Sequence, residues 1–305
     1  MMVNSIIKRF FDYIEIQTKI TSFFAFMMTI AFIVYNKNTV NWKLTLIFFA
    51  SMFIFDLTTT AINNYIDTKT NGLPLAFKRN TARMIIFVML GISTILGLYL
   101  AYQTDLVVFL IGGVCFLCGI FYTFGPVPIS RLPLGEIFSG LFYGLMIPFL
   151  LLYINLPKGT LLTLNVSLEN INLNINVFPV ITVVLLSIIP MCTTANIMLA
   201  NNICDVEKDI QTKRYTLPYY LGKKALYLFA GIYYFAYLDI IFMVALKLLS
   251  PICLIALLTI FIVQKNITQF LKLQDKATTF ILSVKNYIII MGAITILIFL
   301  SRLVS

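Results

Sequence analysis

Long apolar runs recur along the whole of this chain, and they decide what it can fold into. An α-helix needs about 20 apolar residues to cross a bilayer. Within lipid every backbone N–H and C=O group must be paired inside the protein, so only helices and closed barrels span a membrane. The runs lack the alternating polarity of barrel strands, so the sequence predicts an all-α polytopic membrane protein. We place nine spans, at residues 20–36, 44–63, 84–102, 105–124, 135–154, 178–203, 225–246, 249–264 and 285–303.

Composition agrees with this class. Only 11% of residues are charged, against about 25% in a typical soluble domain. The chain contains no histidine, which excludes imidazole as a general base and as a ligand for zinc or haem. The first nineteen residues are expected to be an amphipathic lead-in to the first span rather than a cleaved signal peptide.

Basic residues set the expected orientation. With the N-terminus in the cytoplasm, 17 of the 22 Lys and Arg residues fall on cytoplasmic segments. This asymmetry follows the positive-inside rule and predicts a multi-pass protein of the cell membrane with a cytoplasmic N-terminus. We attribute much of the net charge of +10, including the basic cluster within residues 265–285, to topology and contact with anionic membrane lipid. It does not indicate nucleic-acid binding.

Two polar segments repeat each other. Residues 63–71 read NNYIDTKTN and residues 201–209 read NNICDVEKD, at a constant offset of 138. They end the second and sixth predicted spans, so four spans separate them and both face the same side. We therefore expect one domain over 1–305 with a parallel internal repeat, its halves about 1–134 and 135–305.

Each segment places oxygen-bearing side chains four residues apart. Such positions lie on one stripe of a helix. Two rows of carboxylates and amides facing each other would favour a divalent cation, and Mg²⁺ commonly shares a phosphate with one or two carboxylates. Basic residues follow both segments, as expected where metal-bound diphosphate is held by charged donors. They are Lys69 near the end of the first segment, Lys78 and Arg79 after it, and Lys213 and Arg214 after the second segment.

These motifs on the second and sixth spans resemble those of the UbiA superfamily of intramembrane prenyltransferases. NNICDVEKDIQTKRYTLPYYLG, residues 201–222, is similar to the menaquinone branch, the 1,4-dihydroxy-2-naphthoate polyprenyltransferases. FYTFGPVPISRLPLGEIFSG (121–140) and YIEIQTKITSFFAF (13–26) also resemble that branch. The chain departs from the pattern at Asn71, where the superfamily usually has Asp.

The resemblance implies nine helices around a central cavity, with two Mg²⁺ ions and a polyprenyl diphosphate at the cytoplasmic side. It implies Mg²⁺-dependent transfer of the polyprenyl group to 1,4-dihydroxy-2-naphthoate, with decarboxylation, in menaquinone biosynthesis. The expected metal ligands are Asn63, Asp67, Asn71, Asn201, Asp205 and Asp209, of which Asp67, Asp205 and Asp209 are the expected catalytic residues. The expected substrate contacts are Lys19, Lys69, Lys78, Arg79, Tyr122, Arg131, Lys213 and Arg214.

Several of these residues have specific expected roles. Tyr122 would face the allylic cation, or serve as an interfacial tyrosine. Lys19 or Arg131 would hold the acceptor carboxylate. Glu136 would act in catalysis or anchor the 125–133 loop, and Asp56, in the second span, would order the site or bond a neighbouring helix.

Two alternatives remain open from the sequence. A related prenyltransferase could use another acceptor, such as 4-hydroxybenzoate, haem or a lipid alcohol. A transporter of an anionic lipid or phosphate solute could also carry parallel repeats, although transporter sites lie near the bilayer midplane and these motifs lie at helix ends.

Overall fold

The computed structural model describes residues 2–70, 74–125 and 128–304. It is almost entirely helical and divides into two compact units. The first unit comprises Met1–Ser22 and Trp42–Ser130, and the second comprises Phe23–Asn41 and Arg131–Ser305.

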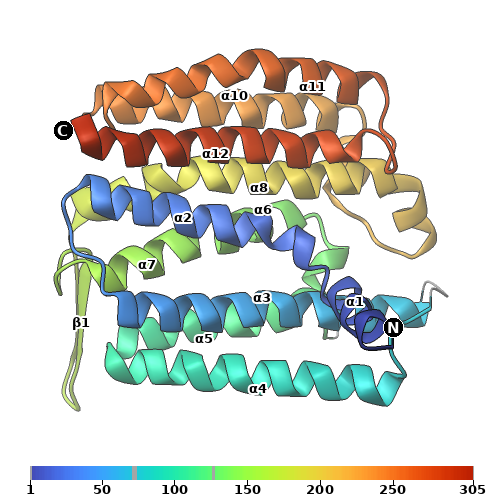
Figure 1. The fold of residues 1–305 in the computed structure, drawn as a ribbon, viewed down its shortest axis with the longest axis horizontal. Coiled ribbons are helices and arrows are strands. Elements are labelled where there is room, and N and C mark those ends of the chain that lie inside the picture. The colour runs from blue at the N-terminus through green and yellow to red at the C-terminus, as the bar shows by residue number, and fades with distance from the viewer. Residues whose placement is uncertain (1, 71–73, 126–127, 305) are drawn as a thin grey trace. The chain divides into compact units, whose positions relative to one another are not determined.

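The first unit is built on three long helices that follow one another in the chain. Helix α3 (Trp42–Thr70) packs against both α4 (Arg79–Gln103) and α5 (Leu106–Thr123). The amphipathic helix α1 (Met2–Ile14) and the short 3₁₀ helix η1 (Ile16–Lys19) precede them and contact α3 (Figure 1). The predicted lead-in to the first span is therefore a helix with its own packing surface.

A small core fixes α1 at the end of α3 that carries the first motif. Tyr13 and Ile14 of α1 are buried with Leu57, Ala61 and Ile62 of α3. The Tyr13 hydroxyl donates a hydrogen bond to the Ala61 carbonyl oxygen at 3.0 Å. The buried α3 residues of this core end at Ile62, and the last two turns of α3 beyond it carry the polar side chains of the first motif.

The second unit is built around α8 (Val177–Gln211), the longest helix (Figure 1). Its helices are α2 (Ile20–Tyr35, from Phe23), α6 (Gly135–Ser139), α7 (Ile147–Asn155), α9 (Leu217–Leu221), α10 (Lys224–Ala245), α11 (Ile260–Lys272) and α12 (Phe280–Val304). A π-helical segment, η3 (Gly140–Met146), joins α6 to α7, and a 3₁₀ segment, η4 (Pro251–Thr259), precedes α11. The segment η2 (Ile129–Arg131) lies where the two units divide.

Close helix packing in this unit depends on small residues. Helix α8 contacts η3, α10 and α12. A Cβ atom at Gly144 of η3 would lie 2.3 Å from the backbone nitrogen of Met191 in α8. Only glycine therefore allows η3 to approach α8 this closely.

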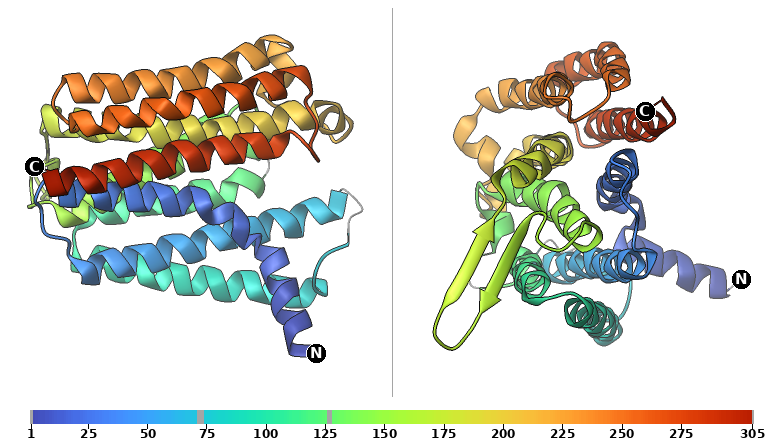
Figure 2. Two further views of the ribbon diagram at one scale, coloured as in Figure 1. Left: turned by 45° about the horizontal axis from the view of Figure 1, so that its top comes forward. Right: turned by 90° about the vertical axis from the view of Figure 1, so that its left-hand side faces the viewer.

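A β-hairpin connects α7 to α8 and projects from this unit (Figure 2). Strand β1 (Leu162–Val166) pairs antiparallel with β2 (Ile171–Ile175). Its cross-strand pairs include Leu164 with Leu173 and Val166 with Ile171, so one face is apolar. This hairpin lies between the predicted spans at 135–154 and 178–203, where alternating Asn residues weaken the apolar signal in the sequence.

The predicted fold class is confirmed. Within the described residues, eight helical segments are long and apolar enough to cross a membrane, and Ile20–Tyr35 is a shorter apolar helix. Each predicted span overlaps one of these nine segments. The main difference is that α3 and α8 continue to Thr70 and Gln211, well beyond the predicted ends at 63 and 203. Both motifs are consequently helical as far as they are described.

Candidate functional site

The second motif occupies the last three turns of α8. Asn201, Asp205 and Asp209 follow one another at intervals of four residues within Val177–Gln211. The predicted helical stripe of oxygen atoms is confirmed for this motif. Asp209 is buried, whereas Asn201 and Asp205 are partly exposed.

Helix α8 ends in a left-handed turn that shapes the motif. Lys213 has φ 55°, its N–H donates to the Ile210 carbonyl at 3.1 Å, and the Arg214 N–H donates to the Asp209 carbonyl at 2.8 Å. This pair of hydrogen bonds is the Schellman arrangement, in which glycine is usual at the left-handed position. Here a lysine takes that position, and the chain reverses just after the last carboxylate.

The reversal brings two predicted site residues together. Arg214 Nε lies 3.6 Å from Asp209 Oδ1. Arg214, a predicted diphosphate donor, is therefore adjacent to Asp209, a predicted metal ligand. A guanidinium here can pair with a carboxylate or with a phosphate oxygen, since both fit its planar fork.

A further basic residue, not predicted from the sequence, joins this motif. Lys276 Nζ lies 2.6 Å from Asp205 Oδ2 and also donates to Asn201 Oδ1. It comes from the loop between α11 and α12, more than 70 residues along the chain. Within the basic cluster of residues 265–285, which we attributed to topology and lipid contact, Lys276 thus has a specific partner as well. No short-range pattern could have revealed this pairing.

Helix α6 anchors the second motif through a buried hydrogen bond. Asn202 Nδ2 donates to Glu136 Oε1 at 2.8 Å, and both side chains are buried. Glu136 thus anchors α8, and its expected roles in catalysis or in anchoring the 125–133 loop stay predictions. In addition, the Tyr215 N–H donates to the Arg131 carbonyl at 3.1 Å. The segment carrying Arg131 is therefore held beside the turn that carries Lys213 and Arg214.

The first motif occupies the corresponding end of α3 in the other unit. Asn63 Oδ1 accepts a hydrogen bond from Thr123 Oγ1 at 3.2 Å, which places Tyr122 at the neighbouring position of α5. Asn64 Nδ2 donates to the Tyr13 carbonyl at 2.9 Å and to Glu15 at 3.0 Å. Asp67 is half-buried, one turn beyond Asn63. Asn71 lies outside the described residues.

Arg79 approaches the end of α3 from the first turn of α4. Its Nη1 donates to the Tyr65 carbonyl at 3.1 Å, and its guanidinium lies 5.2 Å from the Tyr65 ring centroid. Lys69 Nζ lies 5.9 Å from the same ring. Lys78 is exposed immediately before α4. The structure thus gathers Arg79 and Lys69 around Tyr65, two residues from Asp67.

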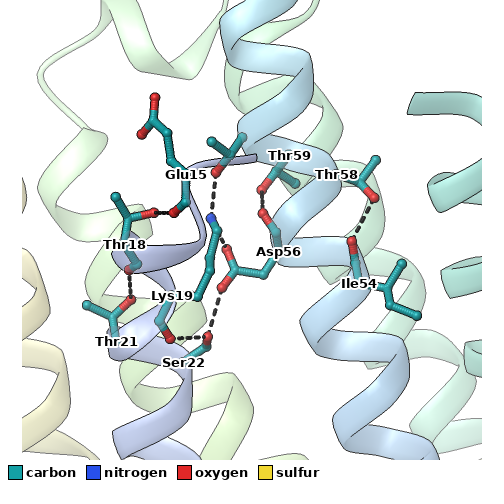
Figure 3. Close-up of polar contacts among 10 residues, drawn as sticks. Glu15, Thr18, Lys19, Thr21, Ser22, Ile54, Asp56, Thr58 and Thr59 are labelled. Atoms are coloured by element: carbon teal, nitrogen blue, oxygen red, sulfur yellow. Dashed lines mark hydrogen bonds and ion pairs between the residues drawn. The ribbon is translucent and has the colours of Figure 1, made fainter. Parts of the chain in front are cut away.

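Lys19 is buried, with 4% of its surface exposed, and it forms an internal ion pair (Figure 3). Its ammonium lies 2.8 Å from Asp56 Oδ1 and also donates to Thr60. Ser22 donates to the other Asp56 oxygen at 2.8 Å. Asp56 therefore bonds η1 and the start of α2 to α3. Direct contact of Lys19 with a substrate stays a prediction.

The donor chemistry of both motifs suits Mg²⁺. Each supplies carboxylate and amide oxygens at helical spacing, which are hard ligands. Within residues 2–70, 74–125 and 128–304, no group of three or more His, Cys, Asp or Glu side chains is arranged to hold a metal ion. An all-protein cage is not what Mg²⁺ requires, since it usually keeps waters and shares substrate phosphates. The residues therefore fit an ion held jointly with a diphosphate, and joint action of the two motifs stays a prediction.

Comparison with known proteins identifies the family. The model of the UbiA prenyltransferase family matches residues 23–297. A 1,4-dihydroxy-2-naphthoate octaprenyltransferase of Bacillus subtilis (strain 168) is 28% identical over 232 residues, covering 70% of this chain and 68% of that protein.

Solved structures share the fold. A digeranylgeranylglyceryl phosphate synthase matches with a TM-score of 0.65 and 18% identity over 98% of this chain and 99% of its own. A UbiA homologue from Archaeoglobus fulgidus, solved with GPP and Mg²⁺, matches with a TM-score of 0.62 and 13% identity over 97% and 98%. The family model and the Bacillus subtilis relative confirm the predicted superfamily and prenyltransferase activity class, and the chain belongs to the UbiA prenyltransferase family.

Proposed function

We propose that this enzyme transfers a polyprenyl group from its diphosphate to 1,4-dihydroxy-2-naphthoate, with loss of CO₂, in menaquinone biosynthesis. The acceptor rests on one observation, the similarity to the naphthoate octaprenyltransferase of Bacillus subtilis over 232 residues. The motif following α8, with Lys213, Arg214 and the Thr-Leu-Pro sequence after them, supports the same branch.

Mg²⁺ is the proposed cofactor, as two ions. Asn63, Asp67 and the undescribed Asn71 would hold one, and Asn201, Asp205 and Asp209 the other. When bound, such ions neutralise the negative charge that develops on a departing diphosphate. The solved Archaeoglobus fulgidus homologue with GPP and Mg²⁺ supports this class of cofactor.

Basic side chains of the enzyme would hold the diphosphate while the allylic C–O bond breaks. Arg214 lies at Asp209, and Arg79 donates to the carbonyl of Tyr65, a residue of the same helix end as Asp67, so each motif has an arginine within its own unit. Lys69, Lys78 and Lys213 are the further donors in this proposal. Donors fixed before reaction stabilise the developing charge without reorganisation, which is the largest source of catalysis in many enzymes.

The organic groups need different surroundings. Tyr122 would offer its ring face to the allylic cation. The hydrogen bond from Thr123 to Asn63 holds the end of α5, which carries Tyr122, against α3. Arg131 would hold the acceptor carboxylate, because its segment is tied to the turn after α8. Lys19 is the weaker choice for that role, since its ammonium already donates to Asp56 and Thr60.

We also propose that both motifs face the cytoplasm. The excess of basic residues on the segments at that end supports this orientation. Membrane lipid would surround the spans and take up the polyprenyl tail.

An acceptor panel tests the function. Membranes containing the enzyme are incubated with labelled polyprenyl diphosphate and Mg²⁺, and with 1,4-dihydroxy-2-naphthoate, 4-hydroxybenzoate, haem or a lipid alcohol in parallel. We expect a labelled, decarboxylated naphthoquinol lipid with the first acceptor and none without Mg²⁺. Product only with another acceptor would overturn the naphthoate assignment while keeping the family chemistry.

A further inference from the structure

Lys276 contacts the second motif, and the proposed reaction gives it no role. It sits in the loop that joins α11, ending at Lys272, to α12, beginning at Phe280. Its ammonium contacts Asp205 Oδ2 at 2.6 Å and Asn201 Oδ1, both oxygens of proposed metal ligands. It also lies 4.8 Å from the Phe280 ring centroid.

The loop presents Lys276 in a defined conformation. Asp275 accepts hydrogen bonds from the Thr278 N–H at 2.8 Å and the Thr278 hydroxyl at 2.6 Å. The buried Thr279 hydroxyl donates to the Leu273 carbonyl at 2.8 Å, which closes the loop on itself. The Thr278 hydrogen bonds also hold the pKa of the Asp275 carboxyl below its ordinary value. The loop backbone is therefore fixed while the long Lys276 side chain can change rotamer.

Lys276 and a divalent ion need the same oxygens. An ammonium within hydrogen-bond distance of Asp205 and Asn201 takes the positions from which those atoms would coordinate a metal. Two cations at one carboxylate also repel each other. The Lys276 side chain is 44% exposed, so it can leave the motif without unpacking the helix bundle.

We propose that Lys276 is an internal cation that competes with Mg²⁺ for Asn201 and Asp205 and pairs with the diphosphate once displaced. The proposal rests on the proposed function, because it uses the metal site of the second motif. Lys276 balances the charge of Asp205 when the ion is not bound. The entering ion brings two positive charges, and the released ammonium stays within reach of a diphosphate held by that ion. The motif would thus bind the metal and diphosphate together more readily than the metal alone.

Mn²⁺ binding, followed by electron paramagnetic resonance on the purified full-length protein, tests this without any turnover. Lys276→Met removes the charge, Lys276→Arg keeps it, and Lys272→Met at the end of α11 is the matched control. We expect Lys276→Met to bind Mn²⁺ alone about tenfold more tightly, a usual size for coupling between two ligands. The same variant should bind prenyl diphosphate less tightly in saturating Mn²⁺, while the control matches the parent protein.

The possible outcomes distinguish failure of the Lys276 proposal from failure of the proposed prenyltransferase function. Unchanged or weaker Mn²⁺ binding by a folded Lys276→Met variant would overturn the competition. If Asp205→Asn leaves the Mn²⁺ binding of the parent protein unchanged, or if the parent binds none, the proposed metal site is wrong. Lys276 and Asp205 would then form a purely structural ion pair. A thermal melt of each variant in EDTA checks folding, and Lys276→Arg should restore parental Mn²⁺ binding.

Discussion

Asn202 donates a hydrogen bond to Glu136 at 2.8 Å, and this bond joins the helix of the second motif to α6. Both side chains are buried, so neither can exchange its partner for bulk water. A buried donor left without an acceptor costs about 1–3 kcal/mol. The position of the motif therefore depends on a residue that contributes no predicted metal ligand.

Glu136→Ala should destabilise the protein by roughly that amount, about 1–3 kcal/mol, because it orphans Asn202. Glu136→Gln keeps an acceptor oxygen and should cost less. Thermal unfolding of both variants in detergent gives the comparison. Equal stability of Glu136→Ala and the parent would show that the bond does not hold α8 in place.

The buried ion pair of Lys19 and Asp56 allows a test of whether Lys19 stabilises the fold or binds substrate. Removing one partner of such a pair costs about 3–5 kcal/mol, because the other charge remains buried alone. Lys19→Met should therefore destabilise strongly. The double variant Lys19→Met/Asp56→Asn removes both charges and keeps an acceptor for Ser22, so its stability should recover.

Kinetics of the same double variant decide the role of Lys19. If Lys19 only stabilises the fold, the KM of the double variant for the acceptor should be close to that of the parent enzyme. A raised KM in the stable double variant would instead support direct contact between Lys19 and the acceptor.

Gly144→Ala should disrupt the packing of η3 against α8. The added Cβ atom would lie 2.3 Å from the Met191 nitrogen, and a backbone atom cannot move aside as a flexible side chain can. Overpacking of this kind costs about 1–3 kcal/mol. Gly231→Ala in α10 is the matched control, because nothing lies within 4 Å of its Cβ position. A melting temperature unchanged in Gly144→Ala would contradict the close approach.

Substitutions of Lys213 can separate the effect of its left-handed backbone conformation from the effect of its charge. A left-handed conformation costs an L-residue about 1–2 kcal/mol, and glycine avoids the cost. Lys213→Gly should therefore be at least as stable as the parent, whereas Lys213→Ala should gain nothing. If the ammonium contacts diphosphate, both variants should raise the KM for prenyl diphosphate equally. A rise in the glycine variant alone would assign the effect to the turn.

The sequence predicted the spans and the motifs well, because both depend on local patterns. Apolar runs define helices in lipid, and the spacing of Asn201, Asp205 and Asp209 is a property of one helix. Long-range partners could not be found in this way. Lys276 reaches Asp205 only because the loop before α12 returns to the end of α8, and Lys19 reaches Asp56 only through the turn at η1. The hairpin was missed because strand pairing, rather than composition, stabilises it.

The central proposal is that both motifs, one at the end of α3 and one at the end of α8, are needed for Mg²⁺-dependent prenyl transfer. The most direct test is prenyl transfer to 1,4-dihydroxy-2-naphthoate by purified enzyme, with and without EDTA, for Asp67→Asn, Asp205→Asn and the double variant. We expect EDTA to abolish product and each single substitution to lower kcat by about 10²–10³, as removal of one preorganised charge-stabilising group does. The double variant should fall little further, because the two motifs serve one step. A folded Asp67→Asn or Asp205→Asn enzyme that retains parental activity would contradict the account.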